Sequence, residues 1–256
     1  MTKRILLTND DGIHAPGLWA LYRALSAHHR VTVVAPDRER SAVGHGITLH
    51  QPIRFETTRV NGSPESFAVS GTPADCVKLG LAELFDGRPD LVLSGINPGA
   101  NVGVNLNYSG TVAAAKEAAL AGIPALAVSI KAPGRDHMDD AARFAEGFAR
   151  QMLAREIPAG TFLNLNFPDM PLAKIRGVRW SRQGTAVFDQ AFEKRRDPRD
   201  RVYYWQGCDR QDAYDQPDID GAALAEQYIS ITPIKCDMTD YDTLRELAQW
   251  EIPVLP

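Results

Sequence analysis

Leu6-Leu7-Thr8-Asn9-Asp10-Asp11-Gly12, close to the N-terminus, is the stretch around which the rest of the chain is interpreted. The apolar run of residues 4–8 is typical of a short buried strand, and a helix is expected over residues 16–27. Ligands of α/β sheets bind at the carboxyl ends of the strands, where Asp10 and Asp11 lie. Adjacent carboxylates there raise each other's pKa unless a cation lies between them. Asp10 and Asp11 are therefore candidates for holding a small hard cation such as Mg²⁺ or Mn²⁺.

Strands and helices alternate along most of the chain, which predicts an α/β fold. Residues 29–35 form a second apolar, β-branched run. The order strand, helix, strand predicts a parallel sheet with a right-handed crossover. Further strands are expected at 89–94, 124–130, 161–167, 175–180 and 228–233, and further helices at 73–85, 111–121, 138–156 and 240–250.

Two segments are expected to extend this core. Residues 47–69 alternate in polarity around Asn61-Gly62, a strong hairpin signal, and predict antiparallel strands inserted beside the parallel core. The charged and aromatic residues 183–216 suit a core poorly and predict a protruding hairpin or arm. We expect one domain over residues 1–256, with a core at about 1–180, a hairpin region at about 181–235 and a terminal helix and tail at 240–256.

Composition and charge disfavour several classes of partner. The formal net charge is −4, from 28 basic and 32 acidic side chains, so there is no general attraction for nucleic acid or an anionic membrane. No apolar run reaches the roughly 18 residues of a membrane span. Cys76, Cys208 and Cys236 are odd in number and lack Cys-x-x-Cys spacing, so neither a disulfide framework nor a zinc cluster is predicted. A cytoplasmic protein with a small-molecule ligand is expected.

The loop after the second strand, residues 38–46, should open on the same sheet edge as the acidic pair. It would bring Ser41 and the Gly44-His45-Gly46 turn toward that pair. Ser41 taken alone is an ordinary loop serine. His45 has no apolar neighbours in sequence, so it is either a proton donor or simply exposed.

Residues 95–110 form a long loop rich in glycine and asparagine, ahead of the helix at 111–121. A loop of more than about a dozen residues inside a compact fold is usually functional. Asn97 follows a strand, and its amide either stabilises an Asx-turn or offers an oxygen to a metal. The loop ends in Ser109-Gly110-Thr111 at a helix N-terminus, which is a natural anion site.

Four blocks of the sequence resemble the SurE (stationary-phase survival protein E) family. They are ILLTNDDGIHAPGL (5–18), VVAPDRERSAVGHGIT (33–48), SGTPADCVKLGL (70–81) and DLVLSGINPGANVGVNLNYSGTVAAAKEA (90–118). The resemblance implies a metal-dependent 5′/3′-nucleotidase that hydrolyses nucleoside monophosphates, and some members also cleave short polyphosphate. It further implies a Rossmann-like three-layer fold with a mostly parallel sheet. An extended C-terminal hairpin, placed here at about residues 185–204, would build homodimers or homotetramers.

The resemblance also implies roles for individual residues. One divalent ion per subunit, Mg²⁺ or Mn²⁺, would be held by Asp10, Asp11, Ser41 and Asn97. The expected catalytic residues are Asp10, Asp11, Asn97 and Ser109. The expected substrate- and phosphate-binding residues are Asn9, Gly44, His45, Asn101, Ser109, Gly110 and Thr111.

Other functional classes stay open at this point. A phospho-acceptor receiver domain also binds Mg²⁺ after its first strand, but it is much shorter and needs an acceptor aspartate where Ser94-Gly95-Ile96-Asn97 stands. A sugar- or nucleotide-binding protein on the same fold would bind without turnover. The usual nucleotide-binding folds are disfavoured, because neither a P-loop nor a Gly-x-Gly-x-x-Gly motif follows the first strand.

Overall fold

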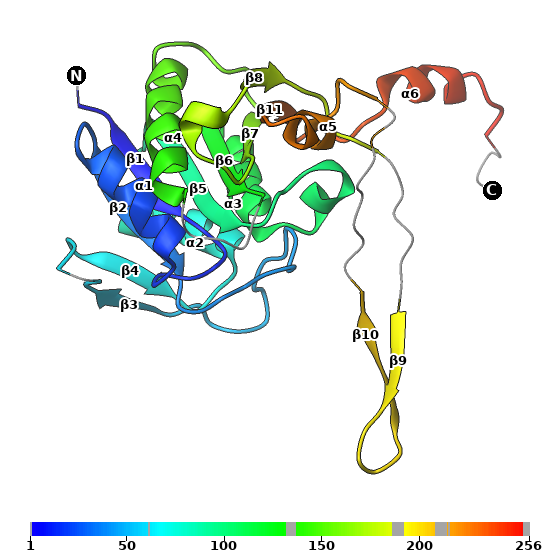
Figure 1. Cartoon of the computed structure of the whole chain (residues 1–256), viewed down its shortest axis with the longest axis horizontal. Coiled ribbons are helices and arrows are strands. Elements are labelled where there is room, and N and C mark those ends of the chain that lie inside the picture. The colour runs from blue at the N-terminus through cyan, green and yellow to red at the C-terminus, as the bar shows by residue number, and fades with distance from the viewer. Residues whose placement is uncertain are drawn as a thin grey trace.

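A computed structural model of the chain describes residues 2–60, 62–131, 137–185, 192–207, 214 and 216–252. Within these residues, one nine-stranded sheet is built from β1 (Arg4–Thr8), β2 (Arg30–Pro36), β3 (Phe55–Thr58), β4 (Ser66–Val69), β5 (Leu91–Pro98), β6 (Ala125–Ile130), β7 (Thr161–Phe167), β8 (Gly177–Trp180) and β11 (Tyr228–Lys235). Its strand order is β3-β4-β2-β1-β5-β6-β7-β11-β8, and only the pairs β3–β4 and β7–β11 are antiparallel (Figure 1). The predicted α/β fold with a mostly parallel sheet is confirmed.

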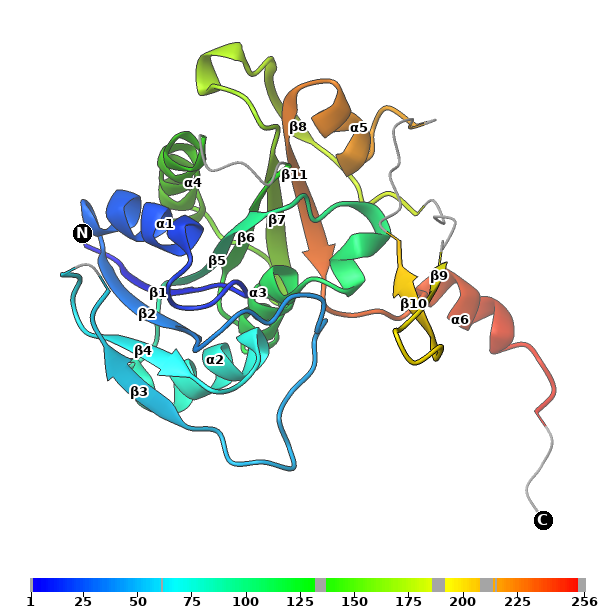
Figure 2. The ribbon, with the colours of Figure 1, turned by 60° about the horizontal axis from the view of Figure 1, so that its bottom comes forward.

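Helices cover both faces of this sheet, as Figures 1 and 2 show. On one face α1 (Pro16–Ser26) packs beside α4 (Met138–Leu153), and on the other α2 (Pro73–Leu79) packs beside α3 (Gly110–Leu120). Alternation along β1 explains the two apolar layers, because Leu7 joins the α1 and α4 side while Leu6 joins the α2 and α3 side. The shorter helices are η1 (Gly80–Leu84), η2 (Gly103–Asn107), η3 (Leu172–Lys174), α5 (Asp220–Ala225) and α6 (Tyr241–Leu247). No helix in the described part of the chain has the length and apolar character needed to cross a membrane.

The segment 47–69 differs in part from its prediction. Strands β3 and β4 pair antiparallel, which confirms the hairpin, although Asn61 itself lies outside the described residues. β4 also pairs in parallel with β2, so the hairpin extends the main sheet instead of lying beside it. Residues 47–54 form no strand, and in this segment the backbone and hydroxyl of Thr48 bind the Asp75 carboxylate.

The predicted arm is a separate antiparallel hairpin of β9 (Phe192–Arg196) and β10 (Val202–Gln206), which projects from the body of the molecule (Figure 1). Every residue of both strands is exposed. The paired strands end at Gln206, slightly beyond the predicted limit, and residues 186–191 of the predicted arm lie outside the described residues. The short helix α5 was not predicted.

Candidate functional site

The candidate site lies at the carboxyl ends of β1 and β5, two neighbouring parallel strands in the middle of the sheet. β1 sits between β2 and β5, and its parallel pairing with β5 sets Thr8 beside Ser94. The carboxyl ends of such neighbouring strands leave a crevice in which α/β proteins bind ligands. Asp10 and Asp11 follow β1, and Asn97 lies near the end of β5. The fold therefore brings the aspartates and Asn97 to one edge of the sheet.

The two aspartates differ in their surroundings. Asp10 is 3% exposed, and its Oδ1 accepts a hydrogen bond from the Thr111 hydroxyl at 2.5 Å. Burial raises the pKa of Asp10, and the Thr111 hydroxyl opposes that rise. Burial, followed by the negative charges of Asp10 and Glu39, raises the pKa of Asp11 to about 7. Oδ2 of Asp11 is buried without a hydrogen-bond partner in the described structure.

The loop after β2 lies directly against the acidic pair. The Arg40 N–H donates to the Asp10 carbonyl at 2.7 Å. A Cβ on Gly12, which has φ +96°, would lie 2.9 Å from the Arg38 carbonyl carbon, so only glycine permits this approach. Ser41 follows Arg40, and its exposed hydroxyl donates to Glu39 Oε1 at 2.7 Å. Sequence analysis did not single out Glu39, although it lies two residues before Ser41.

Asn97 follows an irregularity in β5, whose register with β6 shifts between Ser94 and Asn97. Such bulges commonly redirect a side chain beside an active site. The Asn97 Nδ2 donates to the Gly99 carbonyl at 2.7 Å, so the amide nitrogen stabilises the turn while the amide oxygen stays available as an acceptor. The neighbours of Asn97, Ile96 and Pro98, line a cavity of about 390 Å³ together with Asp11.

The N-terminus of α3 contacts Asp10. A Cβ on Gly110 would lie 2.7 Å from the Asp10 Cβ, so a larger residue would push the helix away from Asp10. Ser109 caps the helix, since its Oγ accepts from the Val112 N–H at 3.1 Å. The positive end of the helix dipole therefore faces the carboxylates, as it would face an anionic ligand bound there.

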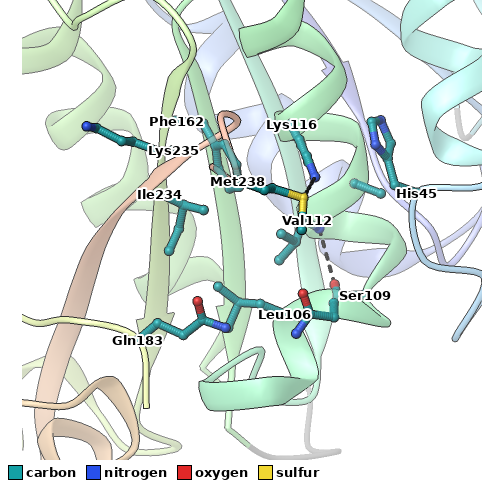
Figure 3. A pocket seen from close by; sticks show the side chains of 12 residues that line it. His45, Leu106, Ser109, Val112, Lys116, Phe162, Gln183, Ile234, Lys235 and Met238 are labelled. Carbon is teal, nitrogen blue, oxygen red and sulfur yellow. Dashed lines mark hydrogen bonds between the residues drawn. The ribbon is translucent and has the colours of Figure 1, made fainter. Parts of the chain in front are cut away.

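A second cavity, of about 150 Å³, is lined in part by Ser109 (Figure 3). Its wall combines apolar and polar side chains. The His45 Nε2 lies 2.8 Å from Glu117 Oε2, so the ring is held in place at the edge of this cavity, and its role as a proton donor stays a prediction. Hydrogen bonds from His45 and Lys78 hold the pKa of Glu117 below its usual value. The other side chains named in Figure 3 are Leu106, Val112, Lys116, Phe162, Gln183, Ile234, Lys235 and Met238.

Three further residues predicted to bind the substrate form hydrogen bonds to other parts of the protein. Asn9 Nδ2 donates to the Gly12 carbonyl at 3.0 Å, and its buried Oδ1 has no partner in the described structure. Asn101 Nδ2 donates to Ser129 Oγ at 2.8 Å, so this nitrogen is already engaged. The Gly44 N–H donates to the Tyr108 carbonyl at 2.9 Å, which ties its loop to η2.

The donors at the edge of the sheet fit a hard divalent cation. Asp10, Asp11, Asn97 and Ser41 would each offer an oxygen atom, and Asp11 Oδ2 is a buried carboxylate oxygen with no hydrogen-bond partner among the described residues. Within the described residues, no three His, Cys, Asp or Glu side chains converge. The predicted set does not require such a cluster, because two of its members are an amide and a hydroxyl.

Comparison with known proteins gives a consistent result. The model of the family "Survival protein SurE" matches residues 5–190. The chain is 58% identical to "5′-nucleotidase SurE" of Desulfatibacillum aliphaticivorans over 97% of this chain and 98% of that protein. It is 47% identical to the protein of the same name from Syntrophobacter fumaroxidans, over 97% of this chain and 100% of that protein. It also resembles the crystal structure of the SurE protein from Aquifex aeolicus, with a TM-score of 0.83 and 36% identity, covering 95% of this chain and 98% of that one. The chain belongs to the SurE family.

Proposed function

We propose that this chain is a metal-dependent 5′-nucleotidase, which hydrolyses nucleoside 5′-monophosphates to nucleoside and phosphate. The similar relatives from Desulfatibacillum and Syntrophobacter are named "5′-nucleotidase SurE". The observation that carries the proposal is the contact between Asp10, which is 3% exposed, and the N-terminus of α3, where Gly110 leaves no room for a side chain. A carboxylate pair with unsatisfied oxygen suits a cation, and a helix N-terminus suits a phosphate.

One Mg²⁺ or Mn²⁺ would be held by Asp10, Asp11, Asn97 and Ser41. Such an ion, when bound, neutralises charge on the phosphate and promotes ionisation of water. Asn97 would contribute its amide oxygen, because its nitrogen donates to Gly99. Ser41 would exchange its bond to Glu39 for the ion, which its exposed position allows.

The chain's own groups would bind and orient the phosphate. The backbone N–H groups of the first turn of α3 and the Ser109 hydroxyl are donors suited to phosphate oxygens. Thr111 would keep Asp10 in one orientation through its hydrogen bond to Oδ1. Hydrolysis breaks the ester P–O bond, water supplies the new oxygen of the phosphate, and the nucleoside oxygen takes up a proton.

We assign the nucleoside to the cavity of Figure 3, because Ser109 belongs both to its wall and to the start of α3. Its lining includes the apolar side chains of Leu106 and Ile234, which suit the face of a base. Lys116 and Gln183 supply polar groups at the wall. His45, held by Glu117, lies on the same wall and is the side chain we assign to the leaving-group side.

Two finer expectations belong to the same proposal. Hydrolysis of 3′-monophosphates and of short polyphosphate is implied by the family resemblance. Assembly into a homodimer or homotetramer is supported by the exposed aromatic residues of the arm, such as Trp205 at 59% exposure, and by Trp250 near α6 at 70%. Large exposed apolar side chains on projecting elements commonly mark interaction surfaces.

The decisive experiment is phosphate release from a panel of 5′- and 3′-nucleoside monophosphates and short polyphosphate. Each is assayed with Mn²⁺, with Mg²⁺ and with a chelator. The proposal expects release from 5′-monophosphates that the chelator abolishes and the metal restores. Absence of turnover with every substrate and metal, in folded protein, would refute it and favour a binding protein.

A further inference from the structure

The turn that precedes α3 is anchored to the C-terminal part of the chain by one carboxylate. Asp220, at the start of α5, is 1% exposed. Its Oδ2 accepts from the Gly103 N–H at 2.8 Å, at the first residue of η2. Its Oδ1 accepts from the Gly184 N–H at 3.1 Å and the Gly221 N–H at 2.9 Å. A single buried side chain therefore connects three backbone segments.

The same junction has a second connection to Gly103. The Gln183 Nε2 donates to the Gly103 carbonyl at 2.9 Å. Gly103 has φ +59°, and a Cβ on it would lie 3.4 Å from the Gly184 carbonyl oxygen. Both backbone polar groups of Gly103 are thus bound from the C-terminal side. At the far end of η2 the Gly44 N–H binds the Tyr108 carbonyl, one residue before Ser109.

The backbone around Asp220 is itself held by hydrogen bonds, so Asp220 is a fixed anchor for Gly103. The Asp220 N–H donates to the Arg182 carbonyl at 3.0 Å, and the Arg182 N–H donates to the Asp218 carbonyl at 3.0 Å. Ile219 and Arg182 form a parallel bridge there. A buried carboxylate is costly unless its oxygens are satisfied, and here the three donors to Asp220 in the described structure are backbone N–H groups. Burying this charge stabilises one backbone arrangement, which includes η2.

We infer that Asp220 is a positioning residue of the phosphate site: it fixes Gly103 so that Ser109, Gly110 and Thr111 meet the phosphate in the right place. This inference rests on the proposed function. Asp220 touches no part of the proposed substrate and acts only through η2. Loss of its bond to Gly103 should therefore weaken phosphate binding more than metal binding, because Asp10, Asp11 and Ser41 lie on other loops and Asn97 lies in β5, before η2 begins.

The test is Asp220→Asn. An asparagine keeps most bonds when its oxygen takes the place of Oδ1, and its NH₂ then points at the Gly103 N–H, where two donors oppose each other. We expect the KM for a nucleoside 5′-monophosphate and the Ki of inorganic phosphate to rise at least about tenfold, as when a hydrogen bond of a charged group is lost. The apparent affinity for Mn²⁺ should stay within twofold. A purely structural role would instead reduce thermal stability and the active fraction, leaving KM and Ki unchanged.

Asp218→Asn is the matched control. It makes the same change of charge two residues away, on an exposed side chain that binds Arg182. We expect both constants to stay within twofold of the wild type. Folded Asp220→Asn protein with unchanged KM and Ki would overturn the inference, and so would an equal effect of Asp218→Asn.

A second variant covers the case in which Asp220→Asn does not fold. Gln183→Leu removes the other bond to Gly103 without disturbing the buried charge. It should raise the Ki of inorganic phosphate by a smaller factor, and an unchanged Ki would overturn the inference. Calorimetric binding of inorganic phosphate in the presence of Mn²⁺ needs no turnover. Absence of hydrolysis by the wild type would therefore refute the proposed function separately.

Discussion

Asp11, after β1, and Asp220, at the start of α5, are carboxylates whose burial raises their pKa, but their oxygens are treated differently. Three backbone N–H groups bind Asp220. Oδ2 of Asp11 is buried without a partner in the described structure, and the charges of Asp10 and Glu39, which raise the pKa of Asp11, are also negative. A satisfied buried carboxylate organises backbone, whereas an unsatisfied one beside like charges is suited to a cation. The hydrogen bonds of the two carboxylates therefore distinguish a structural role for Asp220 from a cation-binding role for Asp11, whereas burial alone does not.

The largest effect is expected from Asp10→Asn and Asp11→Asn. Each variant keeps the size of the side chain and removes one negative ligand, so kcat/KM with Mn²⁺ supplied should fall about 1,000-fold or more. Phosphate release and thermal unfolding are measured together. Asp90→Asn is the control, because Asp90 binds the Arg4 N–H at the opposite edge of the sheet and should leave turnover intact. Near-normal activity of either site variant would contradict the assignment.

Stabilisation of the protein by metal should depend on Asp11 and not on the region around Asp220. Mn²⁺ or Mg²⁺ added after chelation should raise the melting temperature of the wild type, because a ligand of the folded state stabilises it. The increase should be absent in Asp11→Asn and preserved in Asp218→Asn. Calorimetric unfolding with and without chelator provides the measurement, and an equal increase in Asp11→Asn would place the ion elsewhere.

The metal-free protein should lose stability as the pH rises. The pKa of Asp11 is about 7 in the folded chain against an ordinary 3.8, so the folded state binds the extra proton. The contribution of this proton to the free energy of unfolding is complete below about pH 4 and is lost as the pH rises through about 7. The full difference would be worth about 4 kcal/mol, which solvent at the open side of the group reduces. In chelator, Asp11→Asn should flatten this decline in denaturant titrations, whereas Asp90→Asn should retain it.

A smaller effect is expected from Thr111→Val. The substitution removes the hydroxyl that binds Asp10 Oδ1 and keeps the β-branched shape. Loss of a hydrogen bond to a charged group should lower kcat/KM roughly tenfold. Thr111→Ser retains a hydroxyl and should recover most of the activity. Equal rates of the valine and serine variants would show that the hydroxyl does not orient Asp10.

The smallest effect tests the nucleoside cavity. Lys116→Met should raise the KM for nucleoside monophosphates by about threefold, because one polar wall contact is lost, and leave the KM for p-nitrophenyl phosphate unchanged. Lys174→Met, outside the residues that line this cavity, serves as the control. An equal change in KM for both substrates would show that the nucleoside does not bind in this cavity.

The sequence predicted the edge of the sheet well because the relevant signals are local. An apolar run ending in Asp10-Asp11-Gly12 gives both a strand and its carboxyl end, and Ser109 before a run of helix formers gives a cap. The roles assigned to these residues by resemblance stay predictions until the variants are measured.

The missing parts depend on contacts between distant segments. Asp220 lies in an acidic stretch that resembles a solvated loop, and only the folded chain brings Gly103 and Gly184 to it. The bond from Asn101 to Ser129 and the pairing of β4 with β2 are equally non-local. Helix α5 has six residues, too few for a periodic pattern to identify it.

Gly110 limits how the proposed active site can change. At Gly110 the backbone of α3 lies so close to Asp10 that even a Cβ would clash with it. The distance between the helix and Asp10 therefore cannot be changed by substituting a different side chain at this position. Variation in this lineage that alters substrate choice is therefore expected in the walls beyond Ser109. The phosphate end would stay constant while the nucleoside end diverges.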